Sequence, residues 1–73
     1  MTVRKKNEIN KLIGSAIYRA RIKAGMNQPE LANAIGVKYQ QIQKYEKGEI
    51  NISVSRLWLI SIALKKKMEY FLK

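Results

Sequence analysis

The sequence contains no cysteine, no histidine and no aspartate among its 73 residues. These absences exclude a disulfide, a thiol nucleophile, a histidine general base and the usual zinc ligands. The 5 acidic residues are all glutamate, no two of them stand at a catalytic or metal-binding spacing, and no glycine-rich phosphate loop occurs. We therefore predict that the chain is not an enzyme and takes no metal, cofactor or small-molecule ligand.

Long apolar runs are missing as well. No stretch of about 18 apolar residues occurs, and the beginning of the chain lacks a hydrophobic signal core. The sequence therefore predicts neither a membrane span nor an export signal, and the absence of cysteine fits a reducing cytoplasmic setting. At 73 residues, one small domain is the most that the chain can form.

Positive charge is abundant: 15 Lys and Arg stand against the 5 glutamates, a formal net charge of +10. The apolar fraction of 47% is too high for a disordered basic tail, which predicts a folded core. The surplus lies toward the two ends, in runs such as Arg4-Lys5-Lys6 and Lys65-Lys66-Lys67, while the middle of the chain is neutral. One lysine run is usually a solvated face, but a surplus of this size favours a polyanionic partner. We assign residues 1–8 to a basic N-terminal arm and residues 9–73 to a single domain.

The apolar pattern predicts an all-α chain of five helices. Apolar residues from Ile9 to Ala20 recur at the spacing of an amphipathic helix, which we expect to begin near Asn7 or Asn10 and to stop at Gly25. The other expected elements are a second helix capped by Asn27 and closed by Gly36, a third over residues 38–47 closed by Gly48, a loop over residues 49–53, a fourth helix from its cap Ser53 to about Leu64, and a fifth over residues 68–72.

The third helix places its amide and ammonium groups on one face. That polar face consists of Tyr39, Gln40, Gln43, Lys44 and Lys47. Ile42 and Tyr45 lie on the opposite face, where they anchor the helix to the core. A glutamine amide offers a donor and an acceptor together, which matches the N6 and N7 edge of adenine in the major groove, and lysine reaches guanine or phosphate. The same composition is also common on ordinary solvated helices, so this face alone leaves both interpretations open.

A longer series of residues favours the nucleic-acid interpretation over an ordinary solvated helix. The series runs in order and without gaps through Gly14, Arg21, Gly25-Met26-Asn27-Gln28, Leu31-Ala32, Gly36-Val37, Ile42, Tyr45-Glu46-Lys47-Gly48, Arg56-Leu57 and Tyr70-Phe71. On these residues, the segment from Ile13 to Phe71 resembles the helix-turn-helix domain of the phage Cro and repressor class, also called the xenobiotic response element (XRE) family. The resemblance implies a five-helix, lambda-repressor-like domain whose second and third helices form the helix-turn-helix, with the third in the major groove.

The resemblance also implies roles for individual residues. Gln28 matches a phosphate-contacting glutamine at the start of the second helix. The variable base-reading positions are Tyr39, Gln40, Gln43 and Lys44. Asn51 and Arg56 match positions that hold the opposite phosphates. Arg21 and Glu46 match a largely buried ion pair that joins the first and third helices, the alternative being two unrelated surface charges.

Three features depart from the family pattern. Lys38 stands where a serine or threonine usually caps the recognition helix, so we expect no such cap and a phosphate contact from Lys38 instead. Lys65 replaces the glycine that commonly ends the fourth helix. The fourth helix also carries three large apolar residues in place of exposed polar ones: Trp58, Leu59 and Ile62.

A helix that is apolar nearly all round needs cover on two sides. The last helix and the termini of the same chain supply that cover in one interpretation, and a second copy supplies it in the other. We predict a homodimer through helices four and five, which places two recognition helices about 34 Å apart on a palindromic site.

The sequence thus predicts a sequence-specific, double-stranded DNA-binding transcriptional regulator, a repressor that occupies an operator on the nucleoid and excludes polymerase. The alternative is a protein-interaction module, a coactivator or antitoxin-like partner that grips another protein with its fourth helix. A cationic peptide lying on a membrane surface is excluded, because glycines and the single proline interrupt the long helix that it needs.

Overall fold

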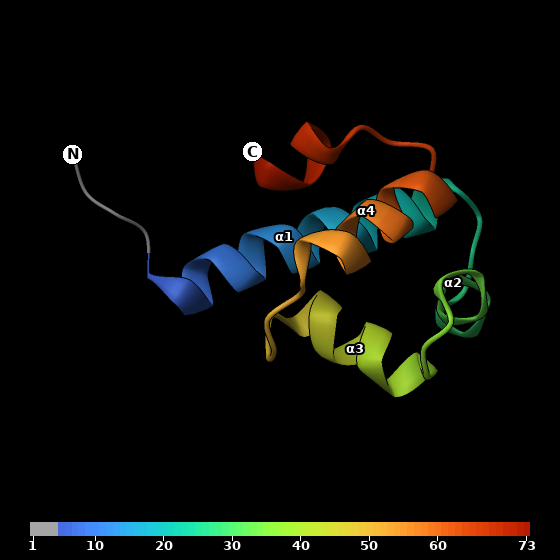
Figure 1. Cartoon of the computed structure of the whole chain (residues 1–73), viewed down its shortest axis with the longest axis horizontal. Helices are drawn as coiled ribbons and strands as arrows, with labels where there is room; N and C mark the ends of the chain where they lie inside the picture. Colours follow the sequence, from blue (N-terminus) through green and yellow to red (C-terminus); the bar gives the residue numbers. More distant parts are fainter. Residues whose placement is uncertain (1–4) are drawn as a thin grey trace.

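The computed structural model describes residues 5–73, which fold into helices joined by short turns (Figure 1). The α-helices are α1 (Lys6–Lys23), α2 (Gln28–Ile35), α3 (Tyr39–Lys47) and α4 (Val54–Ala63). No strand occurs within residues 5–73, and residues 49–53 form a loop. The prediction of an all-α fold is confirmed. No helix in this part of the chain combines the length and apolar character needed to cross a bilayer.

The predicted fifth helix is a different element. Residues Met68–Leu72 form a short 3-10 helix, η1, so the described residues contain four α-helices and not five. Five residues are too few to make a stable α-helix, and 3-10 geometry is common in pieces of this length. Phe71, which is fully buried, fixes η1 on the core.

The first helix begins within one residue of the predicted Asn7, but the predicted cap is wrong. α1 begins at Lys6, and its N-cap residue Lys5 makes no side-chain capping bond, so neither Asn7 nor Asn10 caps it. The side-chain amide of Asn10 instead donates to Asn51 Oδ1 at 2.8 Å, in the loop after α3. Residues 1–4 of the predicted arm lie outside the described residues, and its residues 6–8 belong to α1.

Two predicted N-caps are confirmed. The side chain of Asn27 accepts a hydrogen bond from the Glu30 N–H at 2.8 Å, and the Glu30 carboxylate accepts one from the Asn27 N–H at 2.9 Å. This reciprocal pair is a capping box, which fixes where α2 begins. The Ser53 hydroxyl accepts from the Arg56 N–H at 3.1 Å and caps α4. Lys38 precedes α3 without a side-chain cap, as expected from its lack of a short oxygen-bearing side chain.

The turn that ends α4 has the left-handed backbone conformation typical of glycine, although the residue at that position is Lys65. The backbone φ of Lys65 is 57°, and no other non-glycine residue in the described part has a positive φ. The Lys66 N–H donates to the Ser61 carbonyl at 2.9 Å, which closes the turn in the same way as the glycines that end the three preceding helices. The turn is therefore preserved, and the unfavourable backbone conformation falls on Lys65.

We expect Lys65→Gly to raise the free energy of unfolding by about 0.5–1 kcal/mol relative to Lys65→Ala, because glycine adopts a positive φ without steric cost. Both variants remove the same charge, so the difference isolates the backbone conformation. Urea unfolding followed by circular dichroism measures it. Equal stability of the two variants would contradict the assigned turn.

The core lies between the helices, with α1 at its centre. α1 packs against α3 on one side and η1 on another, and α2 packs against both α3 and α4 (Figure 1). The largest side chains with no appreciable exposure are Ile17, Leu31, Ile42, Ile60 and Phe71. Because every element contributes to this one cluster, α3 is held in place by the whole domain.

Candidate nucleic-acid interface

The outward face of α3 forms the candidate interface. α2 and α3 pack together across the short turn at residues 36–38, and α3 lies at the edge of the molecule (Figure 1). Ile42 and Tyr45 point into the core, with exposed fractions of 0% and 4%. The predicted anchors of this helix are confirmed, and its other face is free to meet a partner.

The predicted reading positions gather on this free face. Lys38, Tyr39, Gln40 and Lys44 are exposed, whereas Gln43 is half-buried. Two shallow hollows flank the start of the helix, one on the side of Ile50 and one between α2 and α3, and both are lined by Lys38 and Gln40. The structure therefore brings these side chains together on one surface.

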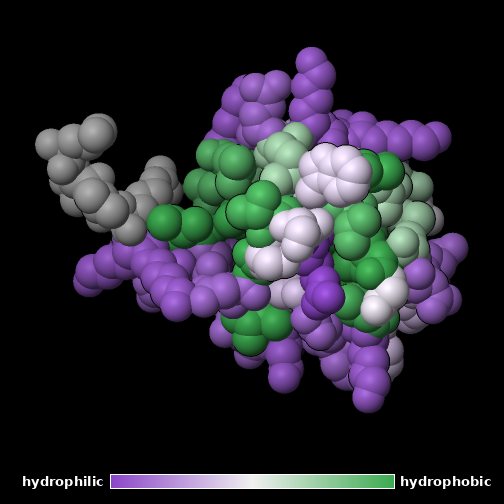
Figure 2. Space-filling model, viewed as in Figure 1, coloured by the Kyte–Doolittle hydropathy of each residue, from purple (hydrophilic) through white to green (hydrophobic). Residues whose placement is uncertain are grey.

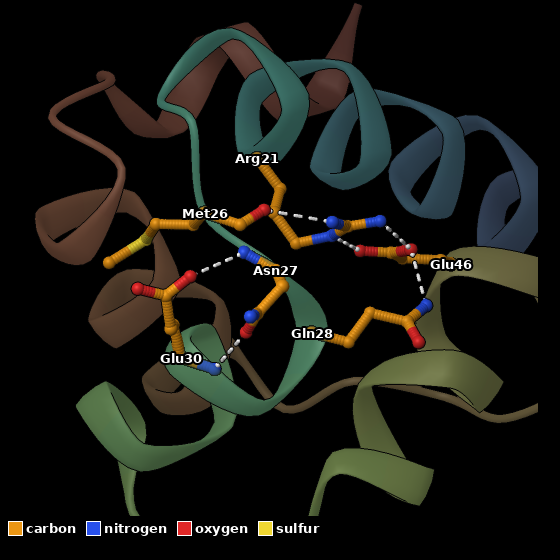
Figure 3. A network of polar contacts seen from close by, with 6 residues as sticks. All are labelled: Arg21, Met26, Asn27, Gln28, Glu30 and Glu46. Carbon is orange, nitrogen blue, oxygen red and sulfur yellow. Dashed lines mark hydrogen bonds and ion pairs between the residues drawn. The ribbon is translucent and has the colours of Figure 1, made fainter.

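An ion pair between Arg21 and Glu46 joins α1 to α3 (Figure 3). Arg21 Nε lies 2.6 Å from Glu46 Oε2, and Arg21 Nη2 donates to Glu46 Oε1 at 3.1 Å. The third contact of the guanidinium is with the Met26 carbonyl, at 2.9 Å from Nη1. Both side chains of the pair are more than nine-tenths buried, with exposed fractions of 8% and 6%. The hydrogen bond to Glu46 raises the pKa of Arg21 against the opposing effect of burial, so Arg21 stays charged.

Gln28 extends this network to the start of α2. Its Nε2 donates to Glu46 Oε1 at 3.0 Å (Figure 3). Sequence reasoning assigned this amide to a phosphate and did not anticipate the bond to Glu46. An amide nitrogen carries two hydrogens, so one remains for an anion in front of the α2 N-terminus.

Asn51 and Arg56 are each held by a contact that sequence reasoning missed. Asn51 Oδ1 accepts the Asn10 amide, which comes from α1. Arg56 Nη1 donates to the Tyr45 hydroxyl at 3.4 Å, and the same hydroxyl accepts Gln41 Nε2 at 2.7 Å. The spacing of Gln41 and Tyr45, one helical turn apart, is a usable local signal. Asn10 and Asn51 lie 41 residues apart and leave no such signal.

The interface consists of amides, a phenol and cations. No group of three or more histidine, cysteine, aspartate or glutamate side chains within residues 5–73 is placed to hold a metal ion. Amides and cations of this kind bind base edges and phosphates through hydrogen bonds and charge.

Comparison with known proteins adds an independent finding. A helix-turn-helix family (HTH_3) matches residues 17–71. An HTH-type transcriptional regulator of Rickettsia conorii is 45% identical over 64 residues, which cover 88% of this chain and 51% of that protein. One from Sinorhizobium fredii is 44% identical over 70 residues, which cover 96% of this chain and 49% of that protein. The chain thus spans about half the length of these relatives.

Solved structures show the same fold. The clp gene regulator ClgR of Corynebacterium glutamicum matches with a TM-score of 0.85 at 25% identity, covering 88% of this chain and 68% of its own. The restriction-modification controller protein C.AhdI of Aeromonas hydrophila matches with a TM-score of 0.81 at 21% identity, covering 85% of this chain and 94% of its own. With the helix-turn-helix of α2 and α3, the match over residues 17–71 and the identity to regulators in agreement, the chain belongs to the XRE-type helix-turn-helix family of transcriptional regulators.

Proposed function

We propose that this chain is the DNA-binding part of a transcriptional regulator and reads double-stranded DNA with the outward face of α3. One observation carries the proposal: α3 is anchored through Ile42 and Tyr45, while its amide and ammonium groups face solvent at the edge of the molecule. An α-helix fits the major groove, where Gln40 and Gln43 match adenine and Lys44 matches guanine or phosphate.

The surrounding polar residues then bind the phosphate backbone on both sides of α3. Gln28 and Lys38 lie at the starts of α2 and α3, and the start of α3, which has no side-chain cap, leaves backbone N–H groups that also favour an anion. Asn51 and Arg56 lie beyond the other end of α3, tethered by Asn10 and Tyr45. Such contacts fix the orientation of a reading helix without specifying the sequence.

Selection of binding sites from randomised duplex DNA tests this function. We expect an enriched palindrome, and an affinity whose logarithm falls by several units per unit of log salt. Gln40→Ala should weaken binding to the best site by about tenfold and relax the preference at one position, since one bidentate base contact is worth about 1–3 kcal/mol. Gln43→Ala should relax a neighbouring position.

Gln41→Ala is the matched control, because the amide of Gln41 is on the same helix and donates to the Tyr45 hydroxyl. It should leave the sequence preference unchanged. Salt-sensitive binding that enriches no sequence would reject base reading by α3 and leave only non-specific attraction to DNA.

We also propose that the regulator acts as a homodimer and a repressor. Trp58, Leu59 and Ile62 on α4 are 54%, 41% and 54% exposed. Apolar side chains gather over this helix in Figure 2. About half of each of these side chains stays exposed among residues 5–73, which supports cover by a second copy. A two-fold axis at this face would place two copies of α3 about 34 Å apart, one for each half of a palindromic site. The dimer bound at that site would then block polymerase.

The variant Leu59→Glu with Ile62→Lys should turn a dimer into a monomer and weaken binding to the palindrome. Light scattering at micromolar concentration measures the mass. Ile22→Lys is the control, since Ile22 is a 52% exposed apolar residue on α1. A monomeric parent chain that loses another protein partner in the α4 variant, with DNA binding intact, would instead support the second candidate function, a protein-interaction module.

A further inference from the structure

A second basic surface lies at the C-terminal end of the described chain. An open hollow there, the C-terminal basic hollow, is lined by Arg19, Lys65, Lys66, Lys67, Tyr70 and Lys73. Glu69 also lines it, so five basic side chains surround a single acidic side chain. Figure 2 shows hydrophilic side chains standing out on this side of the molecule. The proposed interface on α3 uses none of these residues.

The hollow is too far from α3 to serve the same DNA contact. η1 packs against α1 and α4, whereas α3 packs against α1 and α2, so the body of the domain separates the two surfaces (Figure 1). The two shorter extents of the Cα trace are 22 and 20 Å. Charges in water are screened beyond about 8 Å at physiological salt, so the cations of the hollow add little attraction for a duplex bound at α3.

Two details of the hollow fit the binding of repeated phosphates. Lys66 Nζ lies 5.0 Å from the centre of the Tyr70 ring, which holds this ammonium group near the wall of the hollow. Lys65 occupies the position with positive φ, where glycine is favoured on steric grounds and lysine supplies a charge. Lysine ammonium groups act as point charges and accept many phosphate geometries, so an open row of them suits a polymer better than one small anion.

We propose that the C-terminal basic hollow binds the phosphate backbone of a second DNA segment while α3 holds the first, so that the protein bridges two duplexes. The inference rests on the proposed function. When α3 holds one duplex, neighbouring DNA is the polyanion with the highest local concentration at the hollow. The second contact is independent of base sequence and sensitive to salt, since the hollow offers cations and few groups that distinguish bases.

A capture experiment tests the bridge. The full chain is bound to an immobilised duplex carrying its selected site, unbound protein is washed away, and a labelled duplex of unrelated sequence is added. We expect capture of the second duplex by the parent chain and a loss of at least about tenfold with Lys66→Gln, Lys67→Gln and Lys73→Gln combined. The salt slope of capture should fall by about 3, one unit for each phosphate contact removed, while binding to the first duplex changes little.

The matched control removes three exposed lysines in α1 and just before it, with Lys5→Gln, Lys6→Gln and Lys11→Gln combined, and should keep the capture. Capture that survives the hollow variant would place the second duplex on another α3 and overturn the inference. The inference is also overturned if the first duplex binds and the second is not captured. Capture of labelled polyglutamate in preference to the second duplex would overturn it as well. A chain that fails to bind the first duplex overturns the proposed function as well, at a step that the experiment records separately.

Discussion

Gly14→Ala is expected to lower the free energy of unfolding by at least about 2 kcal/mol. A Cβ atom at this position would overlap the carbonyl oxygen of Tyr45 and lie 2.8 Å from that of Glu46, where α1 crosses α3. Both contacts are backbone atoms, so no side chain can rotate away to make room. Alanine favours a helix over glycine by only about 1 kcal/mol, which does not offset a forced separation of two packed helices.

The loss can be measured as a urea midpoint or as a melting temperature, which should fall by roughly 10 °C or more in a domain of this size. Ser15→Ala is the control, because Ser15 is the next residue of α1 and its side chain is exposed. It should be neutral or slightly stabilising. If Gly14→Ala proved as stable as this control, α1 and α3 would not need their close approach, and the placement of α3 would rest on other contacts.

Local chemistry made much of the fold predictable. The caps Asn27 and Ser53 could be found because a short oxygen-bearing side chain before an apolar run acts on N–H groups two or three residues away. Ile42 and Tyr45 could be placed inward because the period of a helix fixes which residues share a face. These signals depend on neighbouring residues only, so the sequence contains them directly.

The errors and omissions have several causes. η1 is a 3-10 helix because five residues are too few for a stable α-helix, and the burial of Phe71 holds it on a core built by other helices. The partners of Asn51 and Gln28 come from α1 and α3, and no local pattern connects such distant positions. The exposed apolar side chains of α4 also show what local sequence patterns leave open. Their apolar character is evident in the sequence, but the sequence alone does not say whether Trp58 and its neighbours are covered within the chain.

Arg21→Ala is expected to lower the free energy of unfolding by about 3–5 kcal/mol, the range for breaking one partner of a buried ion pair. The Glu46 carboxylate would stay buried with only Gln28 as a donor, and the Met26 carbonyl would lose its contact with Arg21. A domain of this size has a total stability of roughly 4–11 kcal/mol, at about 0.05–0.15 kcal/mol per residue, so the loss is a large share of it. Arg19→Ala, at an exposed position of the same helix, should change little.

A double-mutant cycle identifies the cause of that loss. Glu46→Gln removes the stranded charge, so Arg21→Ala should cost less in a Glu46→Gln background than alone, with a coupling of about 1–3 kcal/mol. The raised pKa of Arg21 keeps its share of the stability fully present below the ordinary arginine range, so titration of Arg21 does not alter the coupling near neutral pH. An unchanged urea midpoint for Arg21→Ala, or additive losses in the cycle, would contradict the pair. Because Glu46 also holds the Gln28 amide, Arg21→Ala at a permissive temperature should weaken DNA binding while leaving the base preference set by Gln40 intact.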